Sequence, residues 1–176
     1  MSMTDEAAQL PTATFSFRQC LAWLGLAAFV VVLDQYSKQL IVEHLEYGEQ
    51  IGVTSFFTWV HWRNEGAAFS FLNDAGGWQR WVFVALALGF SAFLINELRR
   101  LRLGENLQAL AFALILGGAL GNMIDRAMLG FVVDFLRFSW SDWYFPAFNV
   151  ADSAIFVGAV LWFTQIWREG FRAERD

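Results

Sequence analysis

The sequence predicts an α-helical integral membrane protein, a bundle of four transmembrane helices with a small β-sheet that forms an outer-face cradle between the first and second spans. Of its 176 residues, 57% are hydrophobic and only 16% are charged, whereas soluble domains average about 25% charged residues. Four apolar stretches approach the ~20 residues needed to cross a bilayer. They cover about 20–42, 78–98, 107–126 and 149–167.

The composition also limits the partners and the domain organisation. A net charge of −5 gives no support for a nucleic-acid partner. Cys20 is the only cysteine, so no intrachain disulfide can form. Two prolines and the lack of low-complexity runs predict one membrane-embedded domain over 1–176. Its first segment, 1–16, lacks the pattern of a signal peptide, and we expect a flexible tail there.

Basic residues predict the orientation of the chain. Seven lie near the N-terminus, in 99–106 and after 167: Arg18, Arg99, Arg100, Arg102, Arg168, Arg172 and Arg175. The opposite side has Arg63 and Arg137 in its loops and Arg80 and Arg126 at the boundaries. Because Lys and Arg favour the cytoplasmic side, we expect both termini in the cytoplasm. The loops 43–77 and 127–148 should then face outward.

The first span carries Asp34 and Lys38, which lie one helical turn apart and share a face. Charged residues inside a membrane are costly and therefore indicate a function. Two interpretations stay open. The two residues either form an ion pair that merely neutralises itself, or they orient part of a site.

The segment from Gln50 to Trp62 is rich in Val, Ile, Thr, Phe and Trp, and it predicts one or two strands. A small outer sheet there would suit an extended peptide, or it would simply cover the bundle. Asn64 and Gly66 follow. Asn64 would hold a substrate carbonyl or amide, or form a plain turn, and Gly66 allows close approach of another backbone.

The second span is almost wholly apolar, and we interpret it as scaffold. The third contains the run LGGALGN, whose small residues allow close helix packing in lipid. It ends with Asn122 and Arg126 on one helix face and Asp125 beside it. The planar guanidinium of Arg126 suits carboxylates and peptide carbonyls.

Two further polar groups border the last span. Asp134 has apolar neighbours on both sides, which makes a solvated loop an awkward place for it. Asn149 and Asp152 open the last span, where an Asn N-cap and an acidic residue in the first turn are common. Capping and catalysis therefore both stay open for Asn149 and Asp152.

Two carboxyl groups that meet can hydrolyse an amide bond. One stays ionised and takes a proton from water, while the other stays protonated and donates. The sequence has two histidines, no HExxH and no Cys/His cluster with metal spacing, so we expect no metal, no cofactor and no His-based nucleophile. The residues alone leave Asp125 as a rival to Asp134 for the partner of Asp152.

Five blocks in order carry a resemblance to a known family. They are Asp34-Gln35-Tyr36-Ser37-Lys38, Asn64-Glu65-Gly66-Ala67-Ala68-Phe69-Ser70, Gly121-Asn122-Met123-Ile124-Asp125-Arg126, Val132-Val133-Asp134-Phe135 and Phe148-Asn149-Val150-Ala151-Asp152. Over about residues 20–167, the chain resembles the bacterial lipoprotein signal peptidases, also called signal peptidase II or prolipoprotein signal peptidase.

The resemblance implies a membrane aspartyl endopeptidase of the bacterial cytoplasmic (inner) membrane, with its site near the outer face. Such an enzyme removes the signal peptide from diacylglyceryl-modified prolipoproteins by cleaving just before the lipobox cysteine. Its partners would be these substrates, membrane lipids and inhibitors of the globomycin type. The resemblance implies that Asp134 and Asp152 are catalytic. It assigns substrate or inhibitor binding to Asn64, Gly66, Asn122, Arg126 and Asn149, and a supporting role to Asp34, Lys38 and Asp125.

Three other functions fit the sequence less well. A presenilin-like intramembrane protease would have a GxGD motif and many more spans, and neither is present. A small transporter or channel would need charges along a path through the bilayer, whereas the charges here lie near one boundary. A non-catalytic assembly protein should tolerate Asn at Asp134 and Asp152.

Overall fold

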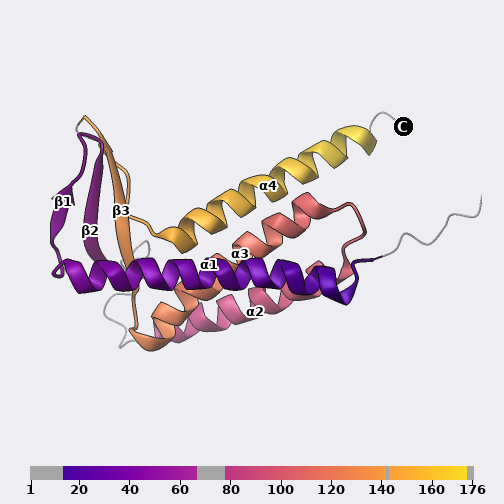
Figure 1. The fold of residues 1–176 in the computed structure, drawn as a ribbon, viewed down its shortest axis with the longest axis horizontal. Coiled ribbons are helices and arrows are strands. Elements are labelled where there is room, and N and C mark those ends of the chain that lie inside the picture. The colour runs from indigo at the N-terminus through magenta and orange to yellow at the C-terminus, as the bar shows by residue number, and fades with distance from the viewer. Residues whose placement is uncertain (1–13, 67–77, 142, 174–176) are drawn as a thin grey trace, which may run out of the picture.

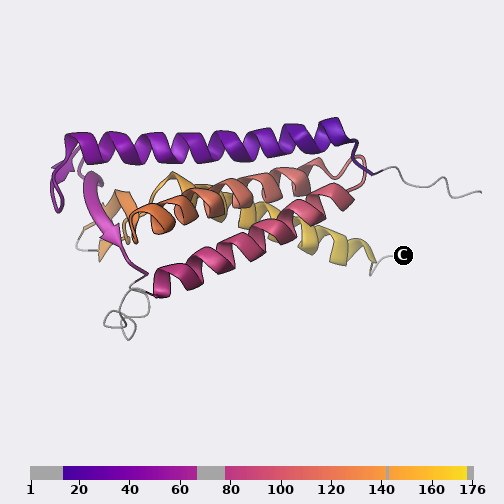
Figure 2. The same ribbon diagram turned by 90° about the horizontal axis from the view of Figure 1, so that it is seen from below.

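The computed structural model describes residues 14–66, 78–141 and 143–173. Its elements in chain order are α1 (Phe17–His44), β1 (Gln50–Gly52), β2 (Phe57–Asn64), α2 (Gln79–Arg100), α3 (Asn106–Met128), β3 (Val132–Trp140), β4 (Trp143–Tyr144) and α4 (Val150–Ala173). Figure 1 shows the sheet at one end of the helices, which we call the sheet end. The described N- and C-terminal residues lie toward the opposite end (Figures 1 and 2).

All four helices are long and apolar enough to cross a membrane, which confirms the predicted fold class. The helix α3 is the most buried, because it packs against each of the other three. Figure 2 shows α1 and α2 on opposite sides of it. The outer helices expose large apolar side chains such as Phe29, Leu86 and Phe156. In a bilayer these side chains contact lipid, so their exposure has no cost there.

Small residues bring the helices close together. A Cβ atom built on Gly117 would lie 2.6 Å from the Ala27 carbonyl oxygen of α1, and one on Gly118 would lie 2.3 Å from the Ala151 carbonyl oxygen of α4. Real Cβ atoms do not approach this closely, so only glycine permits these contacts. The predicted close packing through the LGGALGN run is confirmed.

The sheet has the order β1-β2-β3-β4, with every pair antiparallel. The predicted small sheet between the first and second spans is confirmed by β1 and β2. The structure adds β3 and β4 from the segment 127–148, which we expected only as an outer loop. The β2–β3 register places Trp62 opposite Asp134 and Asn64 opposite Val132. This pairing brings the Asn64 motif to the strand that carries Asp134.

Apolar packing fixes β3 against the bundle. Val133 and Phe135 are buried in a cluster with Ile41 and Leu45 from the end of α1. Asp134 lies between these two apolar side chains in sequence and is itself buried. The awkward neighbourhood of Asp134 therefore has a simple explanation, because it belongs to a buried strand.

The first described residues are held in place. Thr14 pairs with Arg102 in an isolated bridge, and the Phe15 side chain is buried. The Ser16 hydroxyl accepts a hydrogen bond from the Gln19 amide in a capping box that starts α1. Residues 14–16, which we placed in the flexible tail, are thus packed, and the rest of that tail lies outside the described residues.

Candidate active site

The side chains that we predicted for the site converge at the sheet end, where α1, α3, β3 and the start of α4 meet. Each of these four elements supplies one carboxyl group: Asp34, Asp125, Asp134 and Asp152 respectively. Hydrogen bonds and ion pairs connect all four groups into one network through Lys38, Asn122 and Asn149. Arg126 and Gly66 lie at its margin.

Asp134 is enclosed, with 4% of its surface exposed. Its Oδ1 accepts a hydrogen bond of 2.8 Å from the Asn149 side chain, and its Oδ2 accepts one of 3.0 Å from Asn64. Burial, followed by the negative charge of Asp152, raises the pKa of Asp134 to about 7, against the opposing effect of these two hydrogen bonds. Near neutral pH, Asp134 is therefore poised to hold a proton.

Asp152 has different surroundings. It lies in the first turn of α4 and is only half-buried. Its Oδ1 accepts a hydrogen bond of 2.7 Å from the Asn122 side chain, and its Oδ2 accepts one of 3.2 Å from the Asn149 backbone amide. Amide donors and the positive end of a helix favour an ionised carboxylate. One aspartate is therefore enclosed and the other is half-buried, and an acid–base pair needs two carboxyl groups in such different surroundings.

Asn149 connects the two carboxyl groups. Its side-chain amide donates to Asp134, and its backbone N–H donates to Asp152. Its side-chain oxygen accepts a hydrogen bond of 2.9 Å from the Asp152 backbone amide. This last bond and the one from the Asn149 backbone form a capping box for α4. The capping interpretation is thus correct, and the same bonds place both carboxyl groups beside one residue.

Lys38 of α1 is buried in the network, with 3% of its surface exposed. Its ammonium group lies 2.8 Å from Asp34 Oδ2 and 3.0 Å from Asp125 Oδ2. It also donates a hydrogen bond of 2.9 Å to Asn122 Oδ1. Because that oxygen faces Lys38, the Asn122 amide nitrogen faces Asp152. The ion pair of the first span therefore orients part of the site, which favours the second of our two interpretations.

Asp125 anchors β3 to the helices. Its Oδ2 accepts a hydrogen bond of 3.0 Å from the Val133 backbone amide and also faces Lys38. The cation that pairs with Asp125 is therefore Lys38 of α1, which the sequence did not indicate. Asp125 is therefore paired with a cation, whereas its rival Asp134 accepts hydrogen bonds from two neutral side-chain amides.

Gln35 is a member of the network to which the sequence analysis gave no role. Its amide nitrogen donates to Asp125 Oδ1 at 2.8 Å and to the Gly121 carbonyl oxygen at 3.1 Å. It therefore connects α1 to the end of α3. The sequence did contain one indication of this role, because Gln35 belongs to the family motif from Asp34 to Lys38.

Arg126 and Gly66 border the network on the side of α2. The Arg126 guanidinium donates to the Asn122 carbonyl oxygen at 3.4 Å and lies 5.0 Å above the Phe83 ring. Within the part of the chain that the structure describes, it has no carboxylate within 4.0 Å. Gly66 has φ +92° and donates its backbone N–H to Asn64 Oδ1. The rest of its motif, 67–70, lies outside the described residues.

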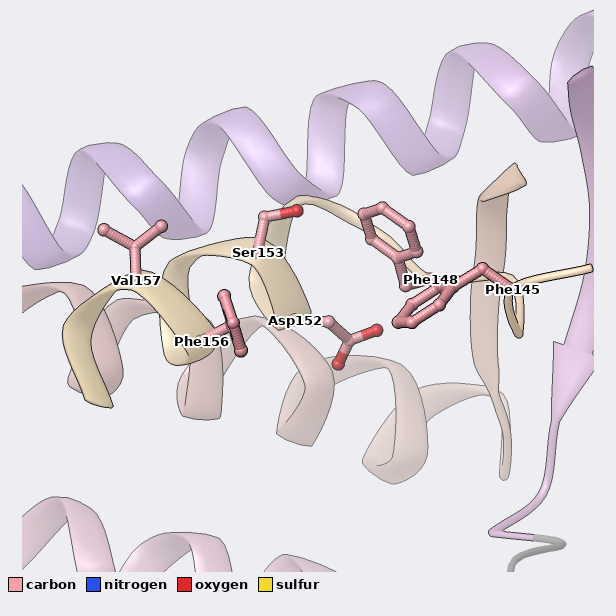
Figure 3. Close-up of a pocket in the computed structure, with 6 residues that line it drawn as sticks. All are labelled: Phe145, Phe148, Asp152, Ser153, Phe156 and Val157. Carbon is pink, nitrogen blue, oxygen red and sulfur yellow. The ribbon is translucent and has the colours of Figure 1, made fainter. Parts of the chain in front are cut away.

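An apolar pocket of about 420 Å³ adjoins Asp152. Its other lining residues are Phe145, Phe148, Ser153, Phe156 and Val157. Figure 3 shows the Asp152 carboxylate beside the two rings that precede α4. This pocket was not predicted from the sequence, in which Phe148 directly precedes Asn149 and Phe145 lies four residues before it.

Known proteins share this sequence and fold. The family described as signal peptidase (SPase) II matches residues 26–168. The chain is 49% identical over 156 residues to the lipoprotein signal peptidase of Aeromonas hydrophila subsp. hydrophila, covering 88% of this chain and 91% of the relative. It is 53% identical over 141 residues to that of Shewanella loihica, covering 80% and 83%.

Two solved structures of bacterial membrane enzymes, obtained by the in meso method, have the same fold. The structure at 2.3 Å resolution has a TM-score of 0.74 at 27% identity, with 89% of this chain and 92% of the other covered. The structure at 1.9 Å has a TM-score of 0.75 at 27% identity, with 88% and 96% covered. The sequence match and the shared fold agree over most of the chain, and the chain therefore belongs to the signal peptidase II family of membrane peptidases.

Proposed function

We propose that the protein is an aspartyl endopeptidase that removes the signal peptide from diacylglyceryl-modified prolipoproteins by cleaving just before the lipobox cysteine. The name lipoprotein signal peptidase, which the relatives share, supports the substrate class. One observation carries the chemistry. A single residue, Asn149, donates to both Asp134 and Asp152, which places an enclosed carboxyl group next to a half-buried one.

The two carboxyl groups divide the work. Asp152 accepts a proton from a water molecule whose oxygen attacks the scissile carbonyl carbon, while Asp134 donates its proton to the carbonyl oxygen. The tetrahedral intermediate then collapses. Asp152 gives its proton to the leaving nitrogen, the C–N bond breaks, and Asp134 regains a proton from the intermediate's hydroxyl group. Both groups thus return to their starting states.

The neighbouring side chains position the substrate and the two aspartates. Asn64 and Asn122 hold the carboxyl groups, and Arg126, with no carboxylate partner among the described residues, faces the peptide carbonyls of the substrate. Gly66 has a positive φ, and the Phe83 ring of α2 fills the space where its Cβ would lie, so Gly66 borders the substrate through its backbone. The sheet gives an extended peptide a place to lie.

The location of the charges supports surface chemistry over transport. The bundle core away from the sheet end is apolar, and it includes Leu94, Leu98, Phe112 and Leu116. A transporter would need polar groups there. In the proposed orientation the protein crosses the bacterial cytoplasmic (inner) membrane with both termini in the cytoplasm. The site then lies near the outer face, where exported prolipoproteins arrive.

A cleavage assay in detergent tests the proposed function. A prolipoprotein with diacylglyceryl on its cysteine is compared with the unlipidated form, with a chelator present throughout. We expect cleavage of the lipidated form only, and inhibition by a globomycin-type cyclic peptide. Loss of activity in chelator would contradict a metal-free mechanism, and cleavage of neither form would contradict the function itself.

A further inference from the structure

We propose that the apolar pocket beside Asp152 holds an acyl chain of the substrate's diacylglyceryl group, so that the enzyme recognises the lipid through α4. This inference rests on the proposed function, because it assumes a lipidated substrate. The pocket volume of about 420 Å³ lies in the range of ~300–1,000 Å³ that is typical of small-molecule sites.

Apart from the Asp152 carboxylate, the lining offers no free polar group to a peptide. The Ser153 hydroxyl donates a hydrogen bond of 2.9 Å to the Asn149 carbonyl oxygen. The two Asp152 oxygens accept hydrogen bonds from Asn122 and Asn149. The other lining side chains are phenylalanines and one valine. A hydrocarbon chain loses no hydrogen bond on entering such a pocket, whereas a peptide backbone would lose its bonds to water.

The pocket is continuous with the lipid-facing surface of α4. Phe156 and Val157 are 69% and 47% exposed, and they lie within a candidate membrane span. Asp152 and Phe156 are one helical turn apart, as are Ser153 and Val157, so the lining follows one face of the helix. From Asp152 to Val157 the helix rises about 7.5 Å. A chain that starts near the carboxylate thus runs along Phe156 and Val157 toward the exposed surface of α4, and the Ser153 hydroxyl beside it is bonded to the Asn149 carbonyl oxygen (Figure 3).

The opposite wall is fixed by the sheet. The Phe148 ring stacks on Phe138 at 5.9 Å and meets the edge of Phe145 at 5.8 Å. Its backbone exchanges hydrogen bonds with Leu136 of β3. The strand that carries Asp134 therefore also holds the pocket wall. An acyl chain seated there would position the attached cysteine against both aspartates.

A comparison of α4 variants with substrates of different chain length tests this inference. Val157→Trp fills the pocket, and Val160→Trp is the matched control. Val160 lies on the same helix, is 48% exposed against 47% for Val157, and does not line the pocket. Phe156→Ala is a second variant, which removes one wall. Each protein is assayed on a prolipoprotein with long-chain or short-chain diacylglyceryl groups, and on an unlipidated one.

In wild type we expect kcat/KM to rise with chain length, by up to about fourfold for each methylene that enters the pocket. Val157→Trp should lower the ratio of long-chain to short-chain kcat/KM by about tenfold, mainly through KM, since a few methylenes lose their place. Phe156→Ala should lower the same ratio. Val160→Trp should keep the ratio of wild type.

Three results would overturn the inference. In the first, Val157→Trp and Phe156→Ala reduce cleavage equally for all chain lengths. In the second, the loss of kcat/KM in these two variants depends on which residues the signal peptide carries and does not depend on the length of the acyl chains. In the third, wild type cuts lipidated and unlipidated substrates equally well, which leaves the peptidase activity standing. Absence of all cleavage by wild type would overturn the proposed function, and this inference with it.

Discussion

Asp134 and Asp152 carry the same functional group, but their surroundings differ. Asp134 is enclosed between buried apolar residues of β3 and receives hydrogen bonds from two side-chain amides. Asp152 is half-buried at a helix start and borders an apolar pocket. The difference predicts which carboxyl group carries the proton and how activity depends on pH.

We expect activity to fall as the pH rises above about 7, because burial and Asp152 raise the pKa of Asp134 to about 7 and the proposed acid must be protonated. A pH profile of kcat/KM checks this. Constant activity through pH 8 and above would contradict the assignment of Asp134 as the acid.

The same pKa predicts a stability effect of defined sign. Since the folded-state pKa of about 7 exceeds the ordinary value of 3.8, the folded protein binds the Asp134 proton more tightly than the unfolded protein does. The contribution to stability is therefore complete below about pH 4 and is lost as the pH rises through 7. The thermal midpoint of wild type should fall relative to that of Asp134→Asn between pH 5 and pH 8, and parallel curves would contradict this.

Lys38 is the one cation that forms ion pairs with both Asp34 and Asp125 among the described residues, so its removal should be costly. For Lys38→Met we expect a loss of about 3–5 kcal/mol in the free energy of unfolding, because Asp34 and Asp125 remain buried without their cation. Arg100→Met is the control. It breaks an exposed pair with Glu97 at 3.6 Å and should change stability by no more than about 0.5 kcal/mol. If unfolding titrations give the same loss of stability for both variants, the Lys38 ion pairs do not stabilise the fold as proposed.

At the scale of single elements, the first turn of α4 is part of the candidate site. The bonds between Asn149 and Asp152 that start the helix are also bonds of the candidate active site. Asp34 adds to this, since its Oδ1 accepts a hydrogen bond of 2.8 Å from the Ala151 backbone amide. The position of α4 against α3 therefore decides where the Asp152 carboxylate lies.

Gly118 tests that dependence. In Gly118→Ala the new Cβ would meet the Ala151 carbonyl oxygen at 2.3 Å, so α3 and α4 must separate. We expect a loss of about 1–3 kcal/mol in stability together with reduced kcat, because Ala151 directly precedes Asp152. In Gly89→Ala of α2 the Cβ meets nothing within 4 Å. This control should be neutral or more stable by about 0.5–1 kcal/mol, and equal behaviour of the two variants would contradict the account.

The sequence predicted the elements unevenly. The helices were predictable because length and apolarity decide which segments can span a bilayer. The strand β3 was missed because its pairing with β2 joins segments far apart in the chain, such as Asn64 and Val132. Charged residues at Asp134 and Arg137 also interrupt its apolar pattern. Register and long-range pairing come from tertiary packing, which a local pattern does not contain.

At the scale of the whole molecule, the chain is polarised. The sheet and the polar network lie at one end, and the first and last described residues and the α2–α3 connection lie toward the other (Figure 1). That second end carries most of the basic residues. Motif matching predicted the members of the site, but the bridging role of Asn149 and the pairing of Lys38 with Asp125 emerged only from the fold, since they join four separate segments.

This polarity predicts opposite accessibility of the two ends. In a Cys20→Ala background, Val53→Cys should react with a membrane-impermeant maleimide in intact spheroplasts. Leu103→Cys should react only after the membrane is opened. Both positions are similarly exposed, at 52% and 55%, so a difference reports the side of the membrane. Labelling of Leu103→Cys from outside would reverse the proposed orientation.

The most direct test of the central claim is cleavage of a lipidated prolipoprotein by Asp134→Asn, Asp152→Asn and Asp125→Asn, each first shown to be folded by thermal unfolding in detergent. The account predicts that Asp134→Asn and Asp152→Asn lose at least about 10²–10⁴-fold in kcat, while Asp125→Asn loses stability and keeps part of its activity. Cleavage by both Asp134→Asn and Asp152→Asn would contradict the aspartate pair, and inactivity of Asp125→Asn alone would show that the wrong partner was chosen.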